Sequence, residues 1–158
     1  MAGSIAFAGW YQFRYSMSVA RTFEVNDARS SQRVLIATQG SKFKDALVAE
    51  VVGYLRARNA YAKVVDISAL TTVNEGDWNA IVIVHTWEMR KPPADVKTFV
   101  DRVSHPGRLV VLTTSGAGDF RMEGVDAISS ASVIADVPAR AADIAAKLDV
   151  LLGESVKH

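Results

Sequence analysis

Val34-Leu35-Ile36-Ala37-Thr38-Gln39-Gly40-Ser41 is the stretch of the sequence that decides the fold. Its first four residues form an unbroken apolar run, which is the pattern of a β-strand buried on both faces. After the glycine, Leu47, Val51 and Leu55 recur at every fourth residue, which predicts an amphipathic helix over residues 44–58. A buried strand, a short turn with a glycine and an amphipathic helix are together typical of one unit of a parallel α/β sheet.

The alternation of strand and helix continues along the chain. Further buried strands are predicted at residues 63–67, 81–84, 109–112 and 125–129. Amphipathic helices are predicted after Pro92-Pro93 and from Asp136 to a stop at Gly153. Two of the connections between strands are shorter than those that hold these helices. Residues 68–77 have room only for a short helix, and residues 115–124 are too few for a full covering helix beside their glycines.

These elements predict an α/β fold of three layers, in which helices cover both faces of a four- to five-stranded parallel sheet. Residues 34–37 are expected at the centre of the sheet, next to residues 81–84, with right-handed crossovers between strands. Ligands of open α/β sheets bind outside the carboxyl ends of the strands. The loops that follow the strands are therefore where a functional site is expected.

The composition is that of one folded domain. The chain has 158 residues, of which 49% are hydrophobic and 22% are charged, so it can bury a core of ordinary size. Eighteen Lys and Arg against 17 Asp and Glu give a net charge of +1, without the basic excess of a nucleic-acid binder. No nucleic-acid partner is expected. The absence of cysteine excludes disulfides, thiol nucleophiles, cysteine-ligated zinc and iron–sulfur clusters.

Residues 1–32 precede the first predicted strand, and residues 1–20 are expected to contribute little to the core. The first 20 are mostly apolar, but Gln12 and Arg14 interrupt them, and a membrane helix needs about 20 apolar residues. Three interpretations stay open: a packed amphipathic helix, a weak secretory signal, and the remnant of a membrane anchor, which the aromatic cluster at residues 10–15 favours. Residues 21–32 are patternless and are predicted to be a linker.

The domain itself is expected over residues 33–153, with residues 154–158 as a tail. A cytoplasmic location is expected, with membrane association through the N-terminal segment as the added hypothesis.

In a parallel sheet, the loops that begin near residues 38, 85 and 114 meet at one edge. The first loop combines hydroxyls, Gly40, Lys42 and a helix N-terminus, which suits a bound phosphate and a simple helix cap equally.

The other two loops also leave alternatives open. Trp87 is either a packed ring or a ligand contact. Gly116-Ala117-Gly118 does not have the spacing of the dinucleotide fingerprint, so this loop is either a turn or a close approach of the backbone to a planar ligand.

Other chemistries have little support in the sequence. His85, His105 and His158 lack the spacing of metal ligands and are expected to be solvated or capped, so no metal site is predicted. Neither a nucleophile elbow nor a P-loop motif occurs. A phosphoacceptor receiver domain shares the architecture, but it needs acidic residues where this chain has Thr38-Gln39 and His85.

Taken in order, several segments resemble the flavodoxin-like family, over about residues 33–152. Residues 34–41 look like its first strand and phosphate loop, and residues 78–84 look like the approach to its third strand. Residues 92–102, Pro-Pro-Ala-Asp-Val-Lys-Thr-Phe-Val-Asp-Arg, are similar to a helix of flavodoxin-like quinone reductases. Thr113-Thr114-Ser115-Gly116 is similar to the strand and loop that flank the flavin ring.

The phosphate loop departs from the family's pattern. Ala37 and Gln39 stand where hydroxyl residues are usual, and Lys42 replaces the final threonine, so hydroxyl ligands are lost and a cation is gained. His85 stands where the family often has glycine or serine, and the helix after the fourth strand is shortened.

The resemblance implies an FMN site, with the phosphate at the first loop and the flavin ring between the other two, stacked on Trp87. The implied cofactor-binding residues are Thr38, Gln39, Gly40, Ser41, Lys42, Thr86, Trp87, Glu88, Met89, Arg90, Ser115, Gly116, Ala117, Gly118 and Asp119.

Two functions stay open. In the first, the protein binds FMN, or another small phosphate-bearing ligand, and takes part in electron transfer to a quinone-like or protein acceptor. In the second, a flavodoxin-fold domain has lost FMN and acts as a membrane-tethered binding or interaction module. Electron-carrier flavodoxins are typically acidic, so the near-neutral charge of this chain disfavours a one-electron shuttle.

Overall fold

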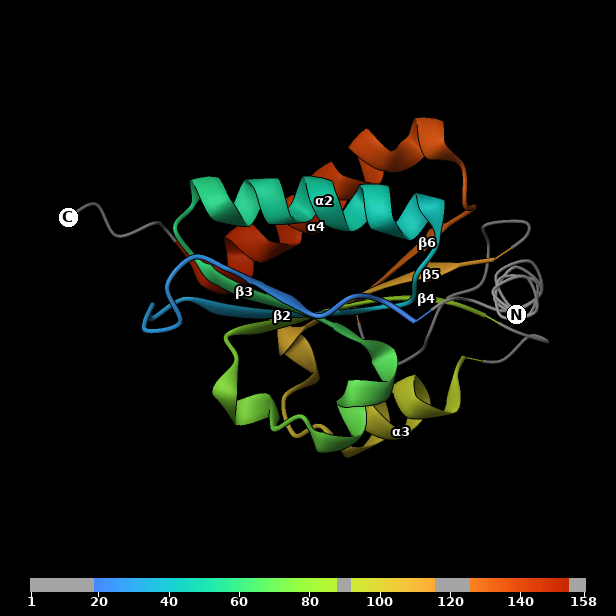
Figure 1. The fold of residues 1–158 in the computed structure, drawn as a ribbon. Coiled ribbons are helices and arrows are strands. Elements are labelled where there is room, and N and C mark those ends of the chain that lie inside the picture. The colour runs from blue at the N-terminus through green and yellow to red at the C-terminus, as the bar shows by residue number, and fades with distance from the viewer. Residues whose placement is uncertain (1–18, 88–91, 116–125, 154–158) are drawn as a thin grey trace, which may run out of the picture.

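Strand β2 (Arg33–Thr38) lies inside a six-stranded sheet with the order β1-β3-β2-β4-β5-β6. The computed structural model describes residues 19–87, 92–115 and 126–153 (Figure 1). The other strands are β1 (Phe23–Val25), β3 (Tyr61–Asp66), β4 (Ala80–Thr86), β5 (Leu109–Thr114) and β6 (Asp126–Ser130). All neighbouring strands are parallel except β1, which pairs antiparallel with β3.

Helices cover both faces of this sheet. Helices α2 (Lys42–Ala57) and α4 (Val137–Leu152) cover one face, here called the α2 side (Figure 1). Helix α3 (Ala94–Arg102) and the 3-10 turn η1 (Ile67–Thr72) cover the other, the α3 side. Three short 3-10 turns complete the connections: η2 (Glu75–Asp77), η3 (Pro106–Arg108) and η4 (Ile134–Asp136).

Each central strand contributes to two hydrophobic cores, because successive side chains of a strand point to opposite faces. Val34 and Ile36 belong to the core on the α2 side, and Leu35 and Ala37 belong to the core on the α3 side. All four are at most 1% exposed. This burial on both faces is why the strand is an unbroken apolar run in the sequence.

The predicted α/β fold with a parallel sheet is confirmed. Strands β2 and β4 are parallel neighbours, with Leu35 opposite Ile81. Strands β2, β4 and β5 are longer at their carboxyl ends than the apolar runs that predicted them, whereas β3 ends at Asp66, one residue before its predicted end. β4 and β5 each continue through two polar residues to Thr86 and Thr114, which are paired across the sheet. The ladder therefore carries polar side chains to the edge where the loops begin.

Within residues 21–32, predicted to be a linker, the structure has a short edge strand. Phe23 lies opposite Val64 and Val25 lies opposite Ala62 in the β1–β3 ladder. Of the three residues only Val25 is buried, so the strand is too short to show a period in the sequence. The domain thus includes backbone pairing that begins before Arg33. The boundaries proposed for the N-terminal segment and the tail stay predictions.

The turn after β1 is held by Asn26, which has a positive φ of 66°. Its side-chain amide donates hydrogen bonds to the backbone oxygens of Leu55, at 3.3 Å, and Ala60, at 2.7 Å. Asparagine tolerates the left-handed region better than most residues, so one side chain shapes the turn and ties β1 to the end of α2.

Replacing Asn26 with alanine is expected to lower the free energy of unfolding by about 2 kcal/mol, because two hydrogen bonds are lost and a Cβ residue without a polar side chain is left at positive φ. Asn26→Gly is the matched control, since it removes the same hydrogen bonds without the backbone strain, and about half of the loss should remain. Urea denaturation of the three proteins measures both effects. Equal stability of Asn26→Ala and wild type would contradict the assigned role.

Among the helices in the described parts of the chain, none combines the length and hydropathy that crossing a bilayer requires. The apolar segment predicted to contact a membrane lies outside the described residues, apart from Val19 and Ala20. The backbone N–H of Ala20 donates to the Asp66 carboxylate at 2.9 Å, so the chain joins the carboxyl end of β3 at this point.

Candidate functional site

The predicted loops meet where the carboxyl ends of β2, β4 and β5 lie side by side. Thr38, at the end of β2, is followed by Ser41, which caps helix α2 by accepting a hydrogen bond from the Lys44 N–H at 3.1 Å. The ends of β4 and β5 bring Thr86 opposite Thr114. A helix start and two threonines from distant parts of the chain therefore share one edge of the sheet.

Lys44 is the residue of this site that the sequence analysis missed. Its side chain is 0% exposed, and its Nζ donates a hydrogen bond of 2.6 Å to Thr86 Oγ1. A signal was present, because Lys44, Leu47, Val48 and Val51 have the spacing of one helix face, so the buried face of α2 extends back to the lysine. A buried ammonium group is unusual and needs polar partners.

Thr86 makes two further polar contacts that join the loops, and its neighbour Trp87 makes a third. Its Oγ1 lies 2.7 Å from Thr114 Oγ1, and its backbone N–H donates to Gln39 Oε1 at 2.9 Å. The backbone N–H of Trp87 donates to the Thr114 oxygen at 3.0 Å. Gln39, Lys44, Thr86 and Thr114 thus form one connected cluster, here called the edge cluster, on the α2 side of the sheet.

His85 lies next to the edge cluster in sequence, but its side chain points to the α3 side. The ring is 0% exposed, and its Nε2 lies 3.0 Å from Thr113 Oγ1. No described residue makes a hydrogen bond to its Nδ1. Burial, and then the positive charge of Lys44, lower the pKa of His85 to about 4. His85 is therefore a neutral, packed histidine at pH 7, and of the two states expected for it, the solvated one is wrong.

The predicted site residues fall into three groups: residues at the carboxyl edge of the sheet, one exposed lysine, and residues outside the described ranges. Thr38, Gln39, Gly40 and Ser115 are buried at the carboxyl edge, and Ser41, Thr86 and Trp87 are half-buried there. Lys42 is exposed. The remaining predicted residues, Glu88, Met89, Arg90, Gly116, Ala117, Gly118 and Asp119, lie outside the described residues. Within the described ranges, no group of three or more histidine or acidic side chains is arranged to hold a metal ion.

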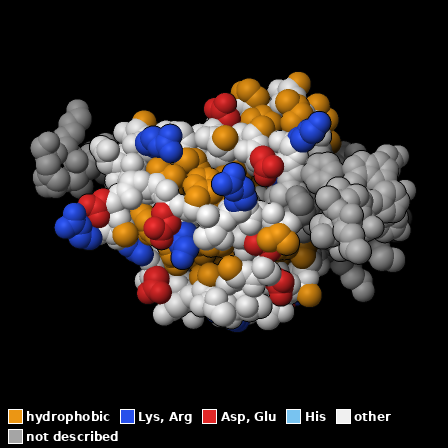
Figure 2. Space-filling view, in the orientation of Figure 1, with side chains coloured by type: hydrophobic (Ala, Val, Ile, Leu, Met, Phe, Trp, Pro, Cys, Tyr) orange, Lys and Arg blue, Asp and Glu red, His pale blue; other side chains and the backbone are white. Residues whose placement is uncertain are grey.

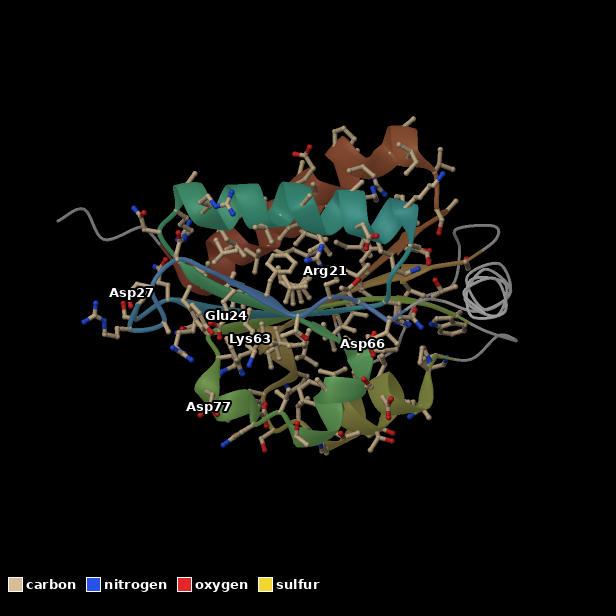
Figure 3. The ribbon with its side chains drawn as sticks, in the orientation of Figure 1. Arg21, Glu24, Asp27, Lys63, Asp66 and Asp77 are labelled. Carbon is tan, nitrogen blue, oxygen red and sulfur yellow. The ribbon has the colours of Figure 1, made fainter. Side chains whose placement is uncertain are left out.

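A pocket of about 360 Å³ opens beside the first loop. Thr38 and Gly40 line it from the loop, and Phe23 and Val64 line it from the strands. Arg21 also lines it and lies between α2 and the sheet in Figure 3, where Figure 2 shows hydrophobic side chains gathered on the surface. β1 and the residues before it therefore form one wall of a hollow, and α2 and the end of β2 also line it.

No family model matches this chain, and no curated protein matches its sequence. Among solved structures, an oxidoreductase from Corynebacterium diphtheriae is similar with a TM-score of 0.50 and 15% identity, over 78% of this chain and 98% of that one. The oxidised flavodoxin 2 from Bacillus cereus has a TM-score of 0.49 and 13% identity, over 75% of this chain and 98% of that one. Likeness at such identities concerns the fold alone.

The parallel strands decide the fold class. Numbered along the chain from β2, they have the order 2-1-3-4-5, which is the order of flavodoxin-like sheets. The fold is flavodoxin-like. Strand β1 is an addition at the outer edge of β3. In a flavodoxin-like sheet, the connections leave the first strand in opposite directions, and ligands bind in the crevice at that switch point. Here the switch point lies between β2 and β4, where Gln39 contacts Thr86.

The polar groups at this flavodoxin-like switch point are of a kind that can bind an anion. The Lys44 ammonium and the Thr86 and Thr114 hydroxyls are all donors to oxygen. Within the described residues, the Thr86 and Thr114 hydroxyls are bonded to the Lys44 ammonium and to each other. The arrangement is therefore suited to holding a ligand, and any redox chemistry would come from what is held.

Proposed function

We propose that the protein binds FMN at the carboxyl edge of the sheet and takes part in electron transfer to a quinone-like or protein acceptor. The observation that carries this proposal is the edge cluster, a buried cation among hydroxyls at the switch point of a flavodoxin-like sheet. Its donors fit a phosphate group, which accepts hydrogen bonds from ammonium and hydroxyl groups. FMN would supply the electron-transfer chemistry, and the chain would bind and orient it.

The residues present suit different parts of such a ligand. Lys44, Thr86 and Ser41 would hold the phosphate, together with the first-turn N–H groups of α2, of which Lys42 and Phe43 have no acceptor inside the helix. Trp87, half-buried and packed against the core on the α3 side, offers an aromatic surface at the same edge. A flavin ring stacked on it would be shielded from water on one side.

A second function is favoured by one specific observation. Gln39 and Lys44 already bond to Thr86, and Thr86 bonds to Thr114, so the polar groups of the edge cluster satisfy one another. Such a closed cluster is what a flavodoxin-fold domain that has lost FMN and serves as an interaction module would have. Under that hypothesis the cluster fastens the loops together and the loops contact a partner.

Titration of the apo protein with FMN decides between the two functions. Saturable quenching of flavin fluorescence at micromolar FMN is expected, and the freshly purified protein is expected to be yellow. Trp87→Ala should weaken FMN binding about tenfold by removing the stacking surface. The titration follows flavin fluorescence for each protein at one salt concentration.

Trp78→Ala is the matched control for this variant. Trp78 is also half-buried, but its ring stacks on Tyr61, at a centroid distance of 6.0 Å, where β3 begins, at the opposite end of the sheet. Its removal should leave the FMN affinity unchanged. Wild-type protein that gives no saturation would overturn the FMN proposal and favour the interaction module.

A further inference from the structure

We propose that Lys44 makes the site selective for ligands that carry a phosphate group, so that FMN binds much more tightly than riboflavin. This inference rests on the proposed flavin site and names the residue whose charge distinguishes a ligand with a phosphate group from one without. The sequence alone pointed to Lys42 for that role, because Lys42 stands in the loop that resembles the phosphate loop.

Burial separates the two lysines. Lys42 is exposed, so water and salt screen its charge. The Lys44 side chain is 0% exposed, and its Nζ lies against Thr86 Oγ1 at the end of β4. Charges interact more strongly where water is excluded, so an anion at this edge responds mainly to Lys44. The positive charge of Lys44, after the effect of burial, also lowers the pKa of His85 on the other side of the sheet.

The edge cluster also gives an anion a way to reach this charge. Thr86 is partly exposed, whereas Thr114 and Gln39 are buried, so Thr86 is the member of the cluster that faces the surface. A phosphate oxygen that accepts a hydrogen bond from Thr86 lies within one hydroxyl of the ammonium. The flexible stem of a lysine lets Nζ turn from Thr86 Oγ1 to a phosphate oxygen with a small movement.

The loss of hydroxyl positions in the first loop agrees with this role. Ala37 and Gln39 cannot supply the hydroxyl donors that the family resemblance leads one to expect there, and the Gln39 side chain is bonded to the backbone of Thr86. A charged donor makes stronger hydrogen bonds to phosphate than a hydroxyl does. A single buried lysine can therefore replace several neutral ligands, at the cost of recognising only charged ligands.

The test compares FMN with riboflavin, which differ only in the phosphate. Each is titrated into wild type, Lys44→Met and Lys42→Met, following flavin fluorescence. We expect wild type to prefer FMN, and Lys44→Met to lose about tenfold or more of its FMN affinity while its riboflavin affinity stays unchanged. Lys42→Met tests the alternative assignment and should keep more of the FMN preference than Lys44→Met does. Lys97→Met, at an exposed position of α3 on the other face of the sheet, is the matched control and should bind both flavins as wild type does. Lys44→Arg, which keeps the charge, should restore part of the FMN preference.

The possible outcomes of these titrations separate the role of Lys44 from the proposal that the protein binds FMN. Flavin binding in which Lys44→Met retains the full preference for FMN would overturn the role of Lys44 and leave the FMN proposal intact. Failure of wild type to bind either flavin would overturn the FMN proposal and this inference with it. If circular dichroism shows that Lys44→Met does not fold, Thr86→Val takes its place. That variant removes the hydroxyl between lysine and surface, and an unchanged preference in it would overturn the inference.

Discussion

Replacing Phe99 with alanine is expected to lower the free energy of unfolding by about 4 kcal/mol, because a large buried ring is lost and a cavity is left. Phe99 is 1% exposed, and α3 places only Val96 beside it as a second fully buried anchor. The Arg102 guanidinium lies 4.7 Å from the ring centroid, so a cation–π contact is lost as well. The core on the α3 side is therefore expected to depend on this ring.

Urea denaturation, followed by circular dichroism, measures the Phe99→Ala effect. Thr98→Ala, at an exposed position of the same helix, is the control and should change the stability by no more than about 0.5 kcal/mol. A loss below about 1 kcal/mol for Phe99→Ala would contradict the packing of α3 against the sheet.

Acid is expected to destabilise the protein through His85. Its pKa is lowered from 6.5 to about 4 in the folded state, first by burial and then by Lys44, so the unfolded chain takes up a proton before the folded chain does. The stability from the neutral ring is complete above pH 6.5 and is lost as the pH falls toward 4. One pKa unit corresponds to about 1.4 kcal/mol, so His85 should account for about 3 kcal/mol between pH 7 and pH 4.

The variant His85→Gln isolates this contribution, because other groups also titrate in acid. Its unfolding free energy should fall less than that of wild type between the two pH values, by about 3 kcal/mol. Thr98→Ala, at an exposed position without a titrating side chain, is the control and should follow the wild-type pH dependence. Parallel curves for wild type and His85→Gln would show that the buried ring does not resist protonation.

The central strands could be predicted from the sequence because parallel strands covered on both faces are apolar at every position. β1 could not, since three residues with one buried side chain contain no period. Lys44 was missed for a different reason. A lysine at the start of a helix is ordinarily part of the solvated boundary, and only its place on the apolar face of α2 distinguishes it.

The edge cluster as a whole was beyond prediction from local patterns. The hydrogen bond between Gln39 and Thr86 joins residues 47 positions apart, and the one between Thr86 and Thr114 joins residues 28 positions apart. The sequence does place all three residues after strands of one parallel sheet, so their convergence follows from topology. Which side chain turns toward which depends on packing that the pattern of polar residues does not contain.

Strand β1 also has a consequence for how the molecule behaves among its own copies. The outer edge of a sheet carries backbone groups that pair readily with another chain, and such pairing starts aggregation. Along β3, three positions of that edge are already paired with β1, with Glu24 opposite Lys63, and both residues lie on this edge in Figure 3. A charged residue at the middle of such a short strand discourages further strand addition. β1 therefore protects the β3 edge against intermolecular β-pairing.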